Sequence, residues 1–222
     1  MHLEGHSLSP EYEKHLWKKR FFLLFLALLS LGVLIFSIAT GAVSIPPLEV
    51  LRALAGKGEP RWSLIIWNIR LPQTLAAFLA GAGLSLAGAV MQSVLRNPLG
   101  SPFTLGISNA AAFGAAFSII VLGSGSMQSS SADAVAITSP ILTTGMAFAA
   151  SLGCMIVVLA IASASRGTPE AMILAGVALS SLFTAGTMFL QYFARDDQLA
   201  AAVFWTFGDV SRATWRDLPL MG

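Results

Sequence analysis

The fold of this chain is decided by the stretch from Arg70 to Ser108, RLPQTLAAFLAGAGLSLAGAVMQSVLRNPLGSPFTLGIS. Within it, the uncharged run from Leu71 to Leu95 is longer than the roughly 20 apolar residues that cross a bilayer. A polar break bracketed by prolines follows this run, and the glycine-rich start of another apolar run comes next. The stretch therefore predicts a membrane span that leads into a broken, functional turn.

The composition of the whole chain is that of an integral membrane protein. Of its 222 residues, 55% are hydrophobic and 11% are charged, and the mean hydropathy is +0.75. The charged share is about half that of a soluble domain. The net charge of +2 is too small and too dispersed to indicate nucleic acid as a partner. The single cysteine, Cys154, allows no intrachain disulfide.

The apolar runs predict an all-α polytopic helix bundle that forms one transmembrane domain over residues 1–222. The predicted parts are a cytoplasmic head at 1–20, spans at 21–40, 71–95, 103–122, 137–163 and 171–193, a short helix at 199–208, and the start of a further span at 213–222. Because the sequence stops where this further span would begin, we expect a chain truncated at its C-terminus.

Lysine and arginine in short connections indicate orientation. The basic head places the N-terminus in the cytoplasm, and the links near Arg96 and Arg166 then fall on the same side. The connection from Gly41 to Arg70 is an exception. It falls outside, yet it has four cationic residues, Arg52, Lys57, Arg61 and Arg70, against two glutamates.

The segment at 199–208 is too short to cross a bilayer. A re-entrant helix, which survives at membrane depth only when it is buried in protein or lines a cavity, is one interpretation. The other is an interfacial helix anchored by Trp205 and Trp215, because tryptophan is enriched at membrane boundaries.

Small side chains recur every four residues in several predicted spans, and such ladders let helix backbones approach closely in a membrane. In the second span the ladder is Ala77, Gly81, Ser85, Ala89 and Ser93, the third span has Gly106, Ala110, Gly114 and Ser118, and the fifth has Gly176, Ser180 and Thr184. These helices are expected to form the inner layer of a tight bundle.

Catalytic and ion-coupling groups are missing from the runs at 71–95, 134–165 and 171–194, which contain no acidic or basic residue. Transporters driven by protons or sodium usually have ionisable groups inside their spans. All three histidines lie in the head, so a histidine-activated serine protease within the membrane is not indicated. Gly56-Lys57 is followed by Gly58 and therefore makes no phosphate-binding loop. Energy for uphill transport would have to come from a partner.

Several motifs resemble those of the FecCD-type permeases of ATP-binding-cassette importers for iron-siderophores, haem and cobalamin. The matching motifs, in order, are RLPQTL at 70–75, GAVMQ at 88–92, NPLGSP at 97–102, LGIS at 105–108, ILAGVAL at 173–179 and FWTFGD at 204–209. They extend over about two thirds of the chain.

The resemblance implies a ten-span permease that pairs with a second copy or a second permease around a central pathway. An extracytoplasmic binding protein would deliver the cargo, a ferric siderophore or else haem or cobalamin. Two cytoplasmic ATPases would drive transport, so ATP would be used by the partner, and this chain itself would bind no cofactor or metal and be no enzyme. The implied location is the bacterial inner membrane, with lipid as a further partner.

In that family, two arginines of an R-x-P-R motif pair with glutamates of the binding protein. Here the resemblance assigns docking to Arg70, while Gln73 occupies the place of the second arginine. An interfacial arginine that binds lipid phosphate is the alternative interpretation of Arg70.

The resemblance also assigns a cytoplasmic gate to Asn97, Leu99, Thr168 and Pro169. The prolines at 98 and 102 keep this turn non-helical, and an ordinary cytoplasmic turn is the alternative. The short helix would lie half-way into the membrane and line the pathway with Phe204, Trp205 and Gly208.

Two other functions stay open at this point. One is a secondary or facilitative transporter built on a similar helical bundle, which predicts dependence on an ion gradient. The other is a membrane scaffold without transport of its own. An adjacent reading frame that encodes a phosphate-binding loop would favour the importer.

Overall fold

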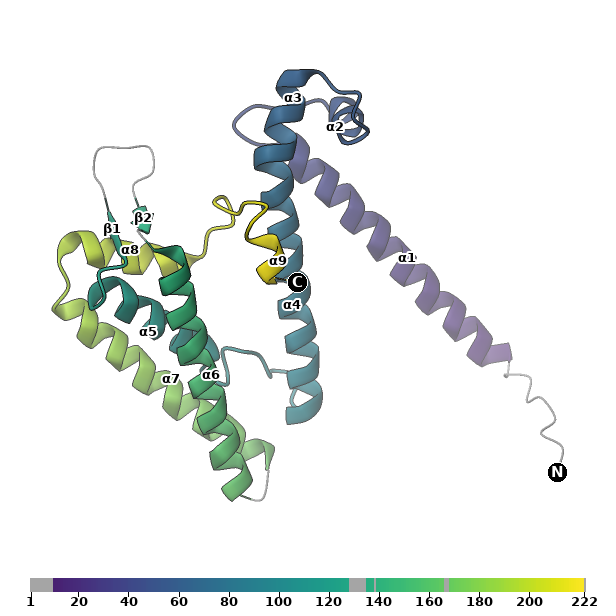
Figure 1. The fold of residues 1–222 in the computed structure, drawn as a ribbon. Helices are drawn as coiled ribbons and strands as arrows, with labels where there is room; N and C mark the ends of the chain where they lie inside the picture. Colours follow the sequence, from purple (N-terminus) through teal and green to yellow (C-terminus); the bar gives the residue numbers. More distant parts are fainter. Residues whose placement is uncertain (1–9, 128–134, 138, 166–167, 222) are drawn as a thin grey trace. The chain divides into compact units, whose positions relative to one another are not determined.

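The predicted all-α polytopic fold is confirmed by a computed structural model that describes residues 10–127, 135–137, 139–165 and 168–221. The helices are α1 (Pro10–Ala39), α2 (Pro47–Leu54), α3 (Pro60–Ile65), α4 (Leu71–Leu95), α5 (Ile107–Ile120), α6 (Pro140–Ala164), α7 (Pro169–Tyr192), α8 (Asp196–Phe207) and α9 (Leu218–Met221) (Figure 1). A π-helical turn, η1 (Ile66–Arg70), joins α3 to α4, and a short ribbon pairs β1 (Gly125–Met127) with β2 (Val135–Ile137) in antiparallel fashion.

Four of the described helical stretches are long and apolar enough to span a membrane. They are Lys14–Ala39, Pro60–Leu95, Pro140–Ala164 and Pro169–Tyr192. The single transmembrane domain stays a prediction, and the residue contacts divide the chain into two compact units. Unit 1 comprises residues 1–79 and 210–222, and unit 2 comprises residues 80–209.

Besides Pro10 of α1, prolines open four more of the described helices, because an N–H at the first helical position has no partner inside the helix and a fixed φ suits the helix start. Pro47, Pro60, Pro140 and Pro169 occupy this place in α2, α3, α6 and α7. The first two of these helices lie within the connection from Gly41 to Arg70, for which the sequence predicts no secondary structure. Unit 1 thus has a folded corner between its first two spans.

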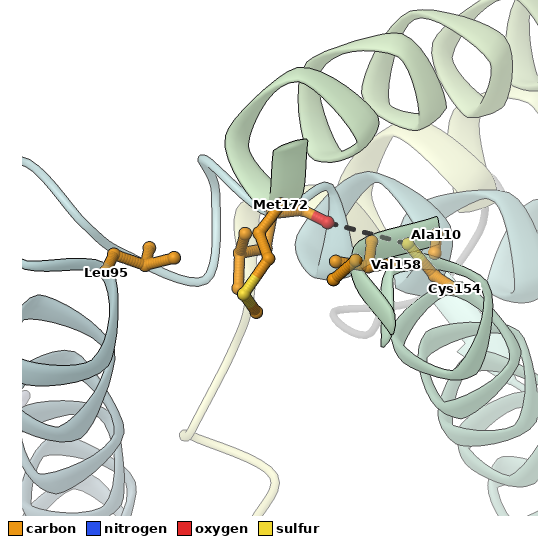
Figure 2. Close-up of a cluster of buried hydrophobic side chains, with 7 residues drawn as sticks. Leu95, Ala110, Cys154, Val158 and Met172 are labelled. Carbon is orange, nitrogen blue, oxygen red and sulfur yellow. Dashed lines mark hydrogen bonds between the residues drawn. The ribbon is translucent and has the colours of Figure 1, made fainter. Parts of the chain in front are cut away.

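Unit 2 is centred on α5, which packs against both α6 and α7. The buried cluster includes Leu105, Ala110, Cys154, Val158 and Met172, and Cys154 Sγ donates a hydrogen bond to the Leu105 carbonyl at 3.6 Å (Figure 2). These side chains come from α5, α6, α7 and the turn that precedes α5. The cluster therefore fixes the turn with respect to the helices of unit 2.

Helix α5 is shorter than the span predicted at 103–122. Its 14 residues extend about 21 Å at 1.5 Å per residue, which is less than the thickness of the hydrocarbon core of a bilayer. Gly106 precedes the helix in a left-handed conformation with φ of 75°, and Gly123 follows with φ of 69°. Glycine adopts such angles readily. The helix therefore begins after Gly106 and ends before Gly123.

Candidate functional site

Arg70, the predicted docking charge, points into unit 1. Its side chain is buried, with 8% of the residue exposed. Nη1 donates to the carbonyl oxygens of Ile38 at 2.6 Å and Ala39 at 3.0 Å, and Nη2 donates to the carbonyl of Val43. The last carbonyls of a helix have no partner within it, and a cation at this end also matches the helix dipole. Arg70 therefore caps the C-terminus of α1.

Gly41 makes room for this cap. A Cβ atom at position 41 would lie 2.9 Å from Nη2 and 3.2 Å from Cζ of Arg70. Real Cβ atoms do not approach so closely, and a larger residue would push the guanidinium off its carbonyls. The sequence offers a signal for this contact only in hindsight, as a glycine directly after an apolar run.

Gln73, which occupies the place of the family's second arginine, also bonds within unit 1. Its Nε2 donates to the carbonyl of Ser211. Six residues earlier, Trp67 stacks on Trp215 with ring centroids 6.2 Å apart and ring planes at 26°. Trp215 Nε1 also donates to the Trp67 carbonyl at 2.7 Å. Segment 211–215 is thus attached to η1 and the start of α4.

The carbonyl of Trp67 is available because of Pro72. In η1 the amide of Leu71 donates to the carbonyl of Ile66, five residues back. Proline has no N–H, so Pro72 cannot make the next bond of this pattern, to Trp67. A π turn commonly accommodates such an interruption of a long helix. The sequence motif that starts the second span therefore leaves one acceptor for a distant tryptophan.

The turn after α4 begins with a Schellman motif. Arg96 has a left-handed φ of 48°, and the amides of Arg96 and Asn97 donate to the carbonyls of Ser93 and Gln92. Two of the last carbonyls of α4 are satisfied in this way. Glycine is the usual residue at the left-handed position, so an arginine there adds strain. Pro98 follows, and the chain cannot continue as a helix.

The predicted gate residues occupy two turns of unit 2. Asn97 Oδ1 accepts a hydrogen bond from the amide of Leu99 at 2.9 Å, and 77% of Leu99 is exposed. Thr168 is the N-cap of α7, where its Oγ1 accepts from the amide of Ala171 at 3.4 Å, and Pro169 is the first helical residue. Each turn is thus shaped by its own side chain.

A shared hydrophobic cluster links the segments on which these two turns lie. Leu95, two residues before Asn97, and Met172, three residues after Pro169, belong to the same buried cluster (Figure 2). Within the described residues, no hydrogen bond joins one turn to the other, and the relation between the two turns depends on the buried cluster that contains Leu95 and Met172.

Two of the predicted packing glycines, Gly106 and Gly176, lie next to each other where the turn before α5 meets α7. A Cβ at Gly176 would lie 2.7 Å from the Leu105 Cα, and one at Gly106 would lie 2.9 Å from the Gly176 carbonyl oxygen. The LGIS motif at 105–108 and the ILAGVAL motif at 173–179 therefore touch backbone to backbone. Gly114 makes a similar approach to α6, since its Cβ would lie 2.8 Å from that of Ala150.

The ladder of the second span lies differently. Ala77, Gly81, Ser85 and Ala89 are exposed, and a Cβ at Gly81 would meet nothing within 4 Å among the described residues. Ser85 Oγ donates to the carbonyl of Gly81 in its own helix at 2.7 Å. The described part of the chain thus leaves this small-residue face uncovered.

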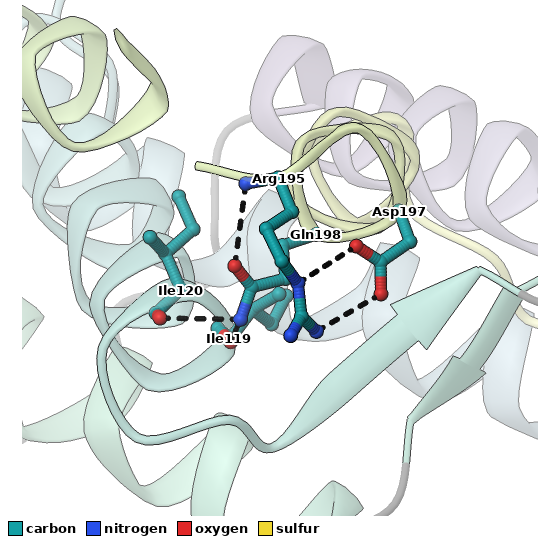
Figure 3. A network of polar contacts seen from close by, with 5 residues as sticks. All are labelled: Ile119, Ile120, Arg195, Asp197 and Gln198. Atoms are coloured by element: carbon teal, nitrogen blue, oxygen red, sulfur yellow. Dashed lines mark hydrogen bonds and ion pairs between the residues drawn. The ribbon is translucent and has the colours of Figure 1, made fainter. Parts of the chain in front are cut away.

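Helix α8, predicted at 199–208, begins at Asp196 and is anchored to α5 by a polar network (Figure 3). Gln198 Nε2 donates to the carbonyls of Ile119 and Ile120 at 3.5 and 3.3 Å, and its Oε1 accepts from the amide of Arg195 at 3.4 Å. Arg195 donates twice to Asp197, at 3.2 Å each, and this bonding lowers the pKa of the Asp197 carboxyl. The sequence reasoning missed Gln198.

The other face of α8 is apolar. Ala201 and Ala202 are buried against Ala116 and Ile119 of α5, and Trp205 packs partly against this cluster. Phe204 is half exposed and contacts Phe207 edge to face, with ring centroids 6.1 Å apart. Gly208 ends the helix with φ of 72°. Of the three predicted pathway residues, Phe204 and Gly208 are therefore exposed, whereas Trp205 packs against the cluster that α8 forms with α5.

These elements, in this order, match a known family. The FecCD transport family model matches residues 26–222. The chain belongs to the FecCD transport family. It is 47% identical, over 96% of its length, to a protein of Methanocaldococcus jannaschii named as an ABC transporter permease. It is 36% identical, over 92% of its length, to the vitamin B12 import system permease protein BtuC of Klebsiella pneumoniae.

Two further FecCD comparisons agree with this assignment. The chain is 32% identical, over 88% of its length, to the achromobactin transport system permease protein CbrC of Dickeya dadantii. A solved structure of a metal-chelate type ABC transporter in an inward-facing conformation matches 90% of the chain with a TM-score of 0.72 and 28% identity, and the match covers 57% of that structure's chain. The chain spans 61%, 56% and 52% of the three curated relatives. Its apolar helices and these relatives show a multi-pass membrane protein.

Proposed function

We propose that this chain is the transmembrane permease subunit of an ATP-binding-cassette importer for a metal chelate. FecCD membership over residues 26–222 carries the proposal, and the B12 and achromobactin permeases among its relatives support the cargo class. Ferric siderophore is the cargo we propose first, with haem and cobalamin as the alternatives. The proposed partners are a second permease copy, two cytoplasmic ATPases and an extracytoplasmic binding protein.

The scarcity of ionisable side chains in the spans supports an ATP-driven system. Helices α4, α6 and α7 contain one ionisable carboxylate, Glu170, and it lies in the first turn of α7. Coupling to an ion gradient usually uses ionisable groups deep inside spans. We therefore propose that the work of transport comes from ATP bound by the partner subunits, and that the permease itself is not an enzyme and holds no cofactor.

Orientation follows from the charges that flank the spans. Lys14, Lys18, Lys19 and Arg20 precede the apolar part of α1 and favour a cytoplasmic N-terminus in the plasma membrane. In this orientation the turns at Asn97 and Thr168 face the cytoplasm, and the corner formed by α2, α3 and η1 faces outward.

The proposed cytoplasmic gate consists of these two turns. Leu99 offers a large exposed apolar side chain on a turn braced by Asn97, and such a side chain can close a pathway against a second copy by excluding water. Thr168 and Pro169 determine where α7 begins, and we propose that they form the second side of the gate. Phe204 and Gly208 of α8 are proposed to line the pathway at its outer half.

Uptake in proteoliposomes tests the function. The full-length permease would be reconstituted with its ATPase and its loaded binding protein, and ferric siderophore, haem and cobalamin would be compared. We expect uptake of one chelate to require ATP inside the vesicle and to persist when ionophores collapse ion gradients. An ATPase whose phosphate-binding lysine is changed to alanine serves as the control. Uptake that needs no ATP and stops with the ionophore would instead identify a secondary transporter.

A further inference from the structure

Helix α1 has a hollow on its surface where its charged part meets its apolar part. The residues that line the hollow are Lys18, Phe21, Phe22 and Phe25. Residues three and four apart are neighbours on a helix surface, so one lysine and three phenylalanines of a single helix can form one face. All four side chains are exposed. The helix thus has an apolar face with an ammonium group at its N-terminal end.

The length of α1 places this hollow at the edge of the bilayer. The uncharged part of the helix, residues 21–39, extends roughly 28 Å at 1.5 Å per residue, close to the roughly 30 Å of the hydrocarbon core. Its C-terminus is capped by Arg70 in the corner of unit 1. Lys18 and Lys19 precede the uncharged part by less than one turn. They therefore lie within the headgroup layer, which is roughly 5–7 Å thick on each side.

The charge at this depth is positive. From residue 14 onward, α1 has no acidic residue, and the three glutamates of the head all come earlier in the chain. Four exposed cations lie in this part of the helix, and within the described residues none of them forms an ion pair: Lys14, Lys18, Lys19 and Arg20. An anionic ligand at headgroup depth would meet cations that have no carboxylate partner.

We propose that Lys18 and Lys19 bind the phosphate of an anionic phospholipid, and that one of its acyl chains lies in the hollow beside them. This inference rests on the proposed function, because it uses the cytoplasmic N-terminus proposed above. The cytoplasmic leaflet contains the anionic lipids that attract basic segments beside a span. Lysine stems lie along apolar surface while the ammonium stays in the polar layer, which suits Lys18 at the edge of an apolar hollow.

A lipid fits this surface better than the ATPase subunit or free phosphate does. The three phenylalanines continue the surface from the headgroup layer into the hydrocarbon, where a soluble subunit cannot follow. Free phosphate would match the two charges and leave the apolar hollow without a partner. A phospholipid has both the anionic group and the apolar chain, in the same order along the membrane normal as Lys18 and Phe25 along the helix.

Native mass spectrometry of the full-length permease in neutral detergent tests the inference. The protein would be titrated with phosphatidylglycerol and with phosphatidylcholine of the same acyl chains. We compare Lys18→Gln/Lys19→Gln with wild type and with Lys18→Arg/Lys19→Arg, which keeps both charges. The matched control is Lys14→Gln/Arg20→Gln. It also removes two charges from α1, but Lys14 lies one turn farther from the hydrocarbon and Arg20 lies on nearly the opposite face from Lys18.

We expect wild type to bind phosphatidylglycerol more tightly than phosphatidylcholine, and the double glutamine variant to lose about 10-fold in affinity for phosphatidylglycerol only. The arginine variant should stay near wild type, and the control should lose less than about 3-fold. Three outcomes overturn the inference. They are equal affinity of wild type for the two lipids, equal losses in the glutamine variant and the control, and displacement of the bound lipid by an equal concentration of inorganic phosphate.

Two further measurements separate folding and function from lipid binding. Both lysines are exposed, so we expect the glutamine variant and wild type to have equal melting temperatures in phosphatidylcholine nanodiscs. Loss of ATPase binding by this equally stable variant would overturn the inference, because the lysines would then belong to a protein contact. ATP-dependent uptake by wild type is measured separately. Its absence would contradict the proposed function, while the comparison of the two lipids would still decide whether the site exists.

Discussion

At the scale of single residues, side chains from later in the chain complete the ends of earlier helices. Arg70 bonds to the last carbonyls of α1, and Gln198 bonds to the last carbonyls of α5. Near a bilayer, backbone polar groups without a partner are costly because lipid offers none. Arg70 and Gln198 thus stabilise helix ends within the chain itself, independently of any partner.

Arg70→Met tests the cap, since methionine keeps much of the side-chain length and removes every donor. We expect a loss of about 1.5–3 kcal/mol in the free energy of unfolding, the usual worth of hydrogen bonds to a charged group. Denaturation of the full-length protein in neutral nanodiscs measures it. Arg61→Met is the control on the same corner, and we expect it to change stability by less than about 0.5 kcal/mol.

The same variant separates the two roles of Arg70. Docking to the binding protein stays a prediction for this residue. If Arg70 docks directly, Arg70→Met slows capture and leaves stability unchanged. If Arg70 caps α1, Arg70→Met lowers the free energy of unfolding. An unchanged free energy of unfolding would contradict the cap.

At the scale of helices and strands, glycine decides which faces meet. Gly114 lies where α5 crosses α6, and Gly106 and Gly176 lie where the turn before α5 touches α7. Close backbone approach is how helices associate in membranes, because lipid removes the hydrophobic drive between them. The short α5 is held on two sides by these contacts, which explains how a 14-residue helix keeps its place in unit 2.

Gly114→Ala should destabilise unit 2. The added Cβ would lie 2.8 Å from the Cβ of Ala150, and backbone rather than a flexible side chain would have to move. Overpacking of this kind costs about 1–3 kcal/mol. Gly153→Ala is the matched control, because it adds the same methyl group to α6 at a site where no described residue lies within 4 Å of the new Cβ. Equal melting temperatures for the two full-length variants would show that α5 and α6 do not pack this closely.

At the scale of the whole molecule, the proposed gate needs a second copy of the chain. Leu99→Cys introduces a thiol on the exposed turn of each permease. We expect a disulfide to form across the pair in the state of the full transporter that closes the cytoplasmic end, and to disappear in the state that opens it. Cross-linking in defined nucleotide states, read on gels, measures this. Leu122→Cys, exposed near the opposite end of α5, is the control. Absence of a Leu99→Cys cross-link in every state would exclude the gate.

The class of the protein, its apolar spans, the order of the family motifs and many helix ends can be predicted from the sequence. These features depend on local chemistry: apolar runs exclude charge, prolines open helices and glycines close them. Small residues at Gly106, Gly114 and Gly176 also predicted close packing from spacing alone, although spacing did not say which faces would meet. The exposed ladder at Gly81 has the same pattern without a neighbour in the described chain.

Tertiary structure alone decided where the polar side chains go. Arg70 bonds to carbonyls 31 and 32 residues away, Gln73 to one 138 residues away, and Trp215 to one 148 residues away. Rules of spacing describe neighbours within about four residues, and they cannot say which distant carbonyl lacks a donor. The packed helices settle that, because each unsatisfied backbone group takes the polar side chain that folding brings within reach.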